Sequence, residues 1–106
     1  GPMIRVSVLY PNQPGKKFDH KYYMEKHLPM VGRRLQPLGL VRTEIDRGIS
    51  AADPKAPAPF VVIFHLFFNS VDDVHNAFRT VGREVMGDIP NYTDIQPQIQ
   101  ISEVVN

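Results

Sequence analysis

Short segments with alternating apolar and polar residues occur along the chain and predict strands. Residues 4–10 read Ile-Arg-Val-Ser-Val-Leu-Tyr, and a similar alternation recurs over residues 40–47. Residues 60–68 are apolar at nearly every position, which is typical of a strand buried on both faces. A last strand is predicted over residues 96–105, with a proline near its start, where a sheet tolerates the missing N–H.

Two of the segments between these strands have apolar residues at helical spacing. Asp19 is the predicted N-cap of the first helix. One set of side chains recurs along this helix at steps of four residues: Tyr23, His27, Val31 and Leu35. Pro29 lies inside this helix and predicts a kink or an interruption, because its ring crowds the carbonyl four residues earlier. The second helix is predicted over about residues 70–85, with valines and a phenylalanine in its apolar stripe.

The predicted order of elements is β-α-β-β-α-β. With right-handed crossovers this order gives a ferredoxin-like fold of the α+β class, in which one antiparallel sheet has both helices on one face. The other face stays open, although the third strand is apolar on that side too. A second copy, packed sheet against sheet, is the simplest cover, so we predict a homodimer that forms a dimeric α+β barrel. Two curved sheets would enclose a cavity for a small molecule.

Length and composition narrow the picture further. The 106 residues suffice for a single domain, expected over residues 3–106, because Gly1-Pro2 resembles the remnant of a cleaved expression tag. A net charge of +1 without long basic runs argues against nucleic-acid binding, and no apolar run is long enough for a membrane span. The chain has no cysteine and no glycine-rich cofactor motif, so neither a cofactor nor a metal is expected. No signal peptide is predicted, and a cytoplasmic location is expected.

Strand parity predicts which side chains line the presumed cavity, because neighbours on a strand point to opposite faces. Val62, Phe64 and Leu66 fit the helix-covered face, and Ile99 and Ile101 fit it on the last strand. The open face then mixes apolar and polar side chains, as small-molecule sites do. The candidate substrate contacts are Ser7, Glu44, Ile63, Phe67, Gln98 and Gln100, with Tyr22 from the first helix and Tyr92 from the loop before the last strand. The alternative for the loop tyrosine is simple anchoring of its loop.

Histidine is the natural acid–base group near neutral pH, and His27 and His65 are the candidates. His27 lies close to the interruption expected at Pro29, which could turn its ring toward the sheet. His65 stands in an otherwise apolar strand and must find a hydrogen-bond partner. Both rings are expected to border one cavity, with the Tyr23 hydroxyl orienting a substrate oxygen. The alternatives are a packing or surface histidine at 27 and a hydrogen-bonded interface histidine at 65. The other two histidines are expected on solvated helix surfaces.

Three segments resemble the EthD family. Residues 18–30, Phe-Asp-His-Lys-Tyr-Tyr-Met-Glu-Lys-His-Leu-Pro-Met, are similar to its Tyr-Tyr…His-x-Pro signature. Residues 67–73 resemble its passage from strand to helix, and residues 89–94 resemble its approach to the last strand. The resemblance covers nearly the whole chain after residues 1–2.

The resemblance implies the dimeric α+β-barrel superfamily. Its members include cofactor-independent monooxygenases, polyketide cyclases, muconolactone isomerases and haem-handling enzymes, and some similar fungal proteins are associated with dehydration or decarboxylation in aromatic polyketide pathways. Carried over residue by residue, the family's motif tyrosine, histidine and proline fall on Tyr23, His27 and Pro29. His65 has no counterpart in that motif.

Three functions remain open. The first is a cofactor-free lyase or isomerase, performing dehydration, decarboxylation, cyclisation or isomerisation on a small apolar substrate of aromatic polyketide-like or carbonyl-bearing type. His27, helped by His65, would transfer the proton. The second is a cofactor-independent monooxygenase in the same cavity, which needs a substrate acidic enough to form a carbanion. The third is a non-catalytic small-molecule-binding accessory protein. Either histidine could also ligate haem, but no motif supports it.

Overall fold

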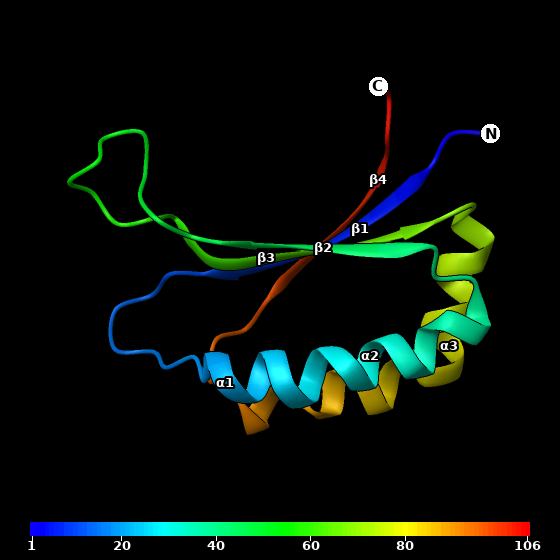
Figure 1. Ribbon diagram of the computed structural model, residues 1–106, viewed down its shortest axis with the longest axis horizontal. Helices are drawn as coiled ribbons and strands as arrows, with labels where there is room; N and C mark the ends of the chain where they lie inside the picture. The colour runs from blue at the N-terminus through cyan, green and yellow to red at the C-terminus, as the bar shows by residue number, and fades with distance from the viewer.

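Four strands form one antiparallel sheet in the computed structural model, which describes all 106 residues (Figure 1). The strands are β1 (Ile4–Pro11), β2 (Arg42–Arg47), β3 (Phe60–Phe68) and β4 (Gln98–Glu103). Their order in the sheet is β2-β3-β1-β4, and every neighbouring pair is antiparallel. This is the ferredoxin-like order, so the fold predicted from the sequence is confirmed.

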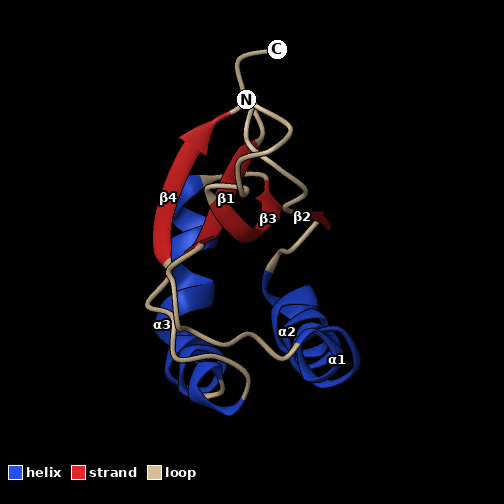
Figure 2. Cartoon of the chain, turned by 90° about the vertical axis from the view of Figure 1, so that its left-hand side faces the viewer, coloured by secondary structure: helices blue, strands red, loops and turns tan.

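Two helical segments cover one face of this sheet, and Figure 2 shows both of them on the same side. The first consists of α1 (His20–Tyr22), the π-helix η1 (Tyr23–His27), α2 (Leu28–Leu35) and the 3-10 turn η2 (Gln36–Leu38). The second consists of α3 (Val71–Gly87) and the 3-10 turn η3 (Ile89–Asn91). None of these helices is long and apolar enough to cross a membrane.

The first helical segment is interrupted just before Pro29, as the proline predicted. At the end of η1 the backbone N–H of Leu28 bonds to the carbonyl of Tyr23, five residues back, instead of four. This wider turn lets α2 start afresh with Pro29 in its first turn, where a missing N–H is tolerated. Single π turns inside helices are frequent at functional sites, and His27 is the last residue of this one.

Side chains of β1 and β3 that point toward the helices form much of the core. Val6, Val62 and Leu66 are no more than 2% exposed, and they belong to one cluster with Leu35 of α2 and Val74 of α3. These residues come from alternate strand positions, as expected when neighbouring side chains point to opposite faces. The strand parity predicted for β3 is therefore confirmed.

Both edge strands extend beyond the cover that the helices provide. Every residue of β2 is exposed. On β4, Ile99 and Ile101 pair with Val8 and Val6, which turns them toward the helix side as predicted. They are nevertheless 45% and 42% exposed. Correct strand parity therefore does not bury a side chain at the edge of this sheet.

Candidate active site

A cluster of polar side chains surrounds the buried His27. The residue ends η1 and is only 3% exposed. Its Nδ1 lies 2.8 Å from Oδ2 of Asp88, the residue that follows α3. The end of the π turn and the end of the second helix therefore meet at this point, which brings together two distant parts of the chain.

Asp88 is stabilised as a carboxylate by its neighbours. The Tyr22 hydroxyl donates to Oδ1 over 2.8 Å, and the side-chain amide of Asn91 donates to the same oxygen over 2.9 Å. Burial alone would raise the pKa of Asp88, but hydrogen bonds from Asn91, His27 and Tyr22 outweigh it and hold the pKa below the usual value. Asp88 is ionised at neutral pH and can only accept hydrogen bonds.

The charge on Asp88 fixes the direction of the other hydrogen bonds in the cluster. His27 must donate from Nδ1, so Nε2 is the acceptor of the neutral ring. This Nε2 lies 3.3 Å from the hydroxyl of Tyr92, and that hydroxyl lies 2.6 Å from the hydroxyl of Tyr10. Donation therefore runs from Tyr10 to Tyr92, from there to His27, and finally to Asp88.

The protonation states agree with this order. Burial lowers the pKa of His27 below its usual value, although the hydrogen bond and charge of Asp88 act in the opposite direction. Burial also raises the pKa of Tyr10 to about 12, and it raises the pKa of Tyr92 as well. The ring is neutral at pH 7 and both phenols keep their protons. An unprotonated Nε2 in a largely apolar environment has the state required of a general base.

Tyr23 lies against the histidine and has a free hydrogen-bond donor. Its ring stacks on His27 with ring centroids 5.5 Å apart and planes 16° apart. Its hydroxyl is buried and has no hydrogen-bond partner of normal geometry, although the Tyr10 hydroxyl lies nearby. Burial raises the pKa of Tyr23 well above the usual value, and Tyr10 raises it further. Buried polar groups without partners are rare in proteins. This hydroxyl is free to donate to the oxygen of a bound molecule.

A narrow cavity between helices and sheet borders this cluster. His27 and Tyr10 contribute its polar side, and Val8, Phe64 and Met86 are among its apolar residues. The cavity volume is about 20 Å³. This volume holds about one water molecule. A larger substrate can therefore enter only if surrounding side chains move.

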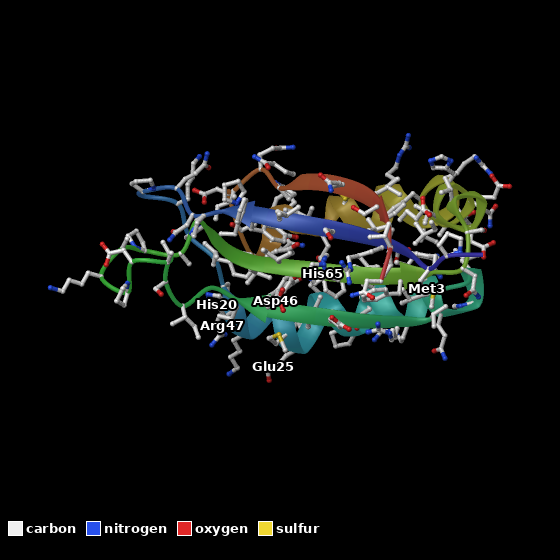
Figure 3. All side chains as sticks on the ribbon, turned by 90° about the horizontal axis from the view of Figure 1, so that it is seen from above. Met3, His20, Glu25, Asp46, Arg47 and His65 are labelled. Atoms are coloured by element: carbon white, nitrogen blue, oxygen red, sulfur yellow. The ribbon has the colours of Figure 1, made fainter.

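His65 lies on the opposite face of the sheet, in a separate polar network. Its Nδ1 is 2.9 Å from the Ser7 hydroxyl, and its Nε2 is 3.0 Å from Oδ2 of Asp46. Figure 3, which views the molecule from above, shows His65 and Asp46 side by side. The histidine side chain is 17% exposed and the aspartate side chain is 62% exposed. His65 has thus found hydrogen-bond partners on a surface that no helix covers.

The other residues predicted to contact a substrate from the open face lie on that face, as strand parity predicted. Phe67 is 1% exposed because the guanidinium carbons of Arg5 and Arg42 lie 5.0 and 3.8 Å from its ring centroid. Strand register places Glu44 beside His65, Ile63 beside Leu9 and Asp46, Gln98 beside Leu9, and Gln100 beside Ser7. None of these side chains reaches the cluster around His27.

The expectation that both histidines border one cavity is therefore wrong for the single chain. His27 faces the interior between helices and sheet, and His65 faces the uncovered side. The structure brings together Tyr22, Tyr23 and Tyr92 around His27 instead. Sequence reasoning missed three members of this cluster, which are Tyr10, Asp88 and Asn91. Tyr10 had the same strand parity as Val6 and Val8, a usable signal, whereas nothing in the sequence marked Asp88.

The fold and this cluster define a small ferredoxin-like protein with a candidate acid–base site. Residues 15–96 match the EthD domain. The chain belongs to the EthD family, as the resemblance of its three segments predicted.

Solved structures agree with this assignment. The chain is similar to an EthD-like protein from Ralstonia eutropha JMP134, with 40% identity, 99% of this chain and 94% of that chain covered, and a TM-score of 0.92. A hydroxynitrile lyase from Passiflora edulis is 14% identical, with 97% and 94% covered and a TM-score of 0.69. A dimeric ferredoxin-like protein from an uncultured marine organism is 12% identical, with 100% and 98% covered and a TM-score of 0.62. The last two likenesses concern the fold alone. No curated protein matches the chain.

Proposed function

We propose that the chain is a cofactor-free enzyme of the lyase or isomerase type, acting on a small apolar substrate that is aromatic or bears a carbonyl group. His27 is the proposed acid–base group. One observation carries the proposal: the imidazole is buried and neutral, its Nδ1–H donates to Asp88, and its Nε2 accepts from the Tyr92 hydroxyl. A carboxylate that orients a histidine in this way recurs in general-base catalysis.

In the proposed reaction a substrate C–H takes the place of the Tyr92 hydroxyl at Nε2. In an isomerisation the imidazole removes this proton and returns it to another carbon. In a dehydration it removes the proton next to the carbonyl, the C–O bond breaks with its electron pair on oxygen, and the departing oxygen takes the proton as water. Negative charge builds up on the carbonyl oxygen in both cases. The unpartnered hydroxyl of Tyr23 is suited to stabilise it.

We also propose that a second copy covers the open face of the sheet. The apolar side chain of Ile63, which is only partly buried on that face, supports this, as does a similar structure that is described as dimeric. The face also contains polar groups that a partner sheet could contact, among them Ser7, Glu44, His65, Gln98 and Gln100. A role of these residues in ligand binding depends on that dimer.

The two other functions would use the same site differently. A cofactor-independent monooxygenase would use His27 to form a carbanion that reacts with dioxygen. A binding protein would need the cavity but not the base. The likeness to a hydroxynitrile lyase supports lyase chemistry only through the shared fold.

A panel of aromatic β-hydroxyketones and β-keto acids, followed by mass spectrometry in air and under nitrogen, tests the proposal. Replacement of His27 by alanine is expected to lower turnover by about two to four orders of magnitude. His75→Ala, at an exposed position of α3, is the matched control and should keep full activity. Full activity of the His27 variant would overturn the assignment. Turnover only in air would identify a monooxygenase, and binding without turnover would identify a binding protein.

A further inference from the structure

A groove runs along the helix-facing side of the edge strand β2. It has a volume of about 390 Å³ and is lined by His20, Tyr23, Met24, Ile45, Arg47 and Val62. It arises because β2 extends beyond the helices, so that its inward-pointing side chains remain accessible. Its volume falls in the range of small-molecule sites, unlike the cavity beside His27.

Two basic side chains stand at the groove without a carboxylate partner. Arg47 takes part in none of the salt bridges of the chain. Burial lowers the pKa of His20, and the charge of the nearby Arg47 lowers it further. Figure 3 shows the two residues together, one from the end of β2 and one from the start of α1. The charge of Asp19 raises the pKa of His20. The carboxylate of Asp19 is also the N-cap of α1, because it accepts a hydrogen bond from the backbone N–H of Tyr22.

Apolar side chains form the rest of the groove. Met24 and Ile45 are 48% and 38% exposed, which is high for large hydrophobic residues. The ring of Tyr23 and the side chain of Val62 complete the apolar lining. A wall that combines the positive charge of Arg47 with exposed apolar side chains suits a ligand with a negative group on an apolar body.

We infer that this groove binds an amphipathic carboxylate, with the carboxylate at Arg47 and His20 and the apolar part against Met24 and Ile45. The guanidinium group presents two parallel N–H donors that match the two oxygens of a carboxylate. The inference concerns binding alone and stands whether or not His27 performs acid–base chemistry.

Binding of 2-naphthoate to the ¹⁵N-labelled protein, followed by NMR, tests this inference. The neutral 2-naphthamide is the comparison ligand, because it keeps the apolar body and lacks the charge. Naphthoate is expected to cause saturable shifts at Met24, Ile45 and Arg47. Arg47→Gln should weaken naphthoate binding about tenfold, as loss of a charge-assisted hydrogen bond does, and should leave naphthamide binding unchanged.

Arg83→Gln is the matched control, because Arg83 is exposed on α3, also forms no salt bridge and does not line the groove. It should bind naphthoate like the unmodified protein. The inference is overturned if naphthoate causes no saturable shifts in the groove. It is also overturned if both arginine variants weaken binding equally, or if Arg47→Gln weakens both ligands to the same degree.

Discussion

Replacement of Tyr92 by phenylalanine removes one hydroxyl that serves two buried neighbours. This hydroxyl accepts from Tyr10 and donates to His27, and those residues are 1% and 3% exposed. Each buried polar group left without a partner costs about 1–3 kcal/mol. The free energy of unfolding should fall by about 2–4 kcal/mol, below the full sum, since the adjacent cavity has room for about one water.

Replacement of Tyr10 by phenylalanine should lower the free energy of unfolding less than Tyr92→Phe does, because Tyr10 is the donor in its hydrogen bond to Tyr92. Tyr92 then loses one hydrogen bond that it accepts but still donates to His27, so no buried donor is left unpaired. The expected loss is about 1 kcal/mol. In the double variant only the histidine nitrogen loses its partner. The double variant should therefore be more stable than the sum of the single effects predicts, by about 0.5 kcal/mol or more.

Urea unfolding followed by circular dichroism, at one fixed protein concentration, measures these differences. Tyr23→Phe is the control, because its hydroxyl has no partner and its removal should leave stability unchanged or slightly higher. The donation order is refuted if Tyr10→Phe costs as much as Tyr92→Phe, or if the two effects simply add.

Three other properties can be measured without a substrate. The folded-state pKa of His27 lies below the ordinary 6.5, so the unfolded chain binds the proton first. The free energy of unfolding should therefore fall as the pH drops below about 6.5 toward the lower pKa of folded His27. Urea midpoints measure this fall. The contribution of His27 to the fall should be absent in His27→Gln and present in the control His75→Gln. A Cβ at Gly48 would lie 2.2 Å from the carbonyl oxygen of Phe60. Gly48→Ala should therefore cost about 1–3 kcal/mol in thermal melts, whereas Gly32→Ala, with nothing within 4 Å, should gain about 0.4–1 kcal/mol. Light scattering should give about twice the chain mass of 12.0 kDa, and a monomer at micromolar concentration would contradict the proposed dimer.

Local patterns in the sequence were enough to predict the fold. Alternation located the first two strands because each side-chain direction depends only on the position along the strand, and a nearly continuous apolar run located β3. Pro29 predicted the interruption of the first helix for an equally local reason, since its ring excludes one carbonyl in the preceding turn. The form of that interruption, a π turn that ends at His27, depends on packing against the rest of the molecule and was not predictable in this way.

The cluster around His27 was only partly predictable, because its contacts join distant residues. Asp88 lies beyond the end of α3, and its hydrogen bond to the histidine spans 61 positions. The hydroxyl pair of Tyr10 and Tyr92 spans 82 positions. No periodicity connects such residues. The resemblance to the EthD motif singled out His27 and Tyr23, but it said nothing about what orients them.

The separation of the two histidines follows from topology that the sequence already contained. In this fold both helices lie on one face of the sheet, so a helix residue that points toward the sheet meets only the covered face. Parity had assigned His65 to the other face. A single cavity for both rings therefore conflicted with the predicted fold itself. The arrangement divides the molecule into two polar centres, with Asp88 and His27 inside and Ser7, His65 and Asp46 outside. If a second copy covers the outer centre, changes at His65 should alter association first, whereas changes at His27 should alter chemistry without dissociating the dimer.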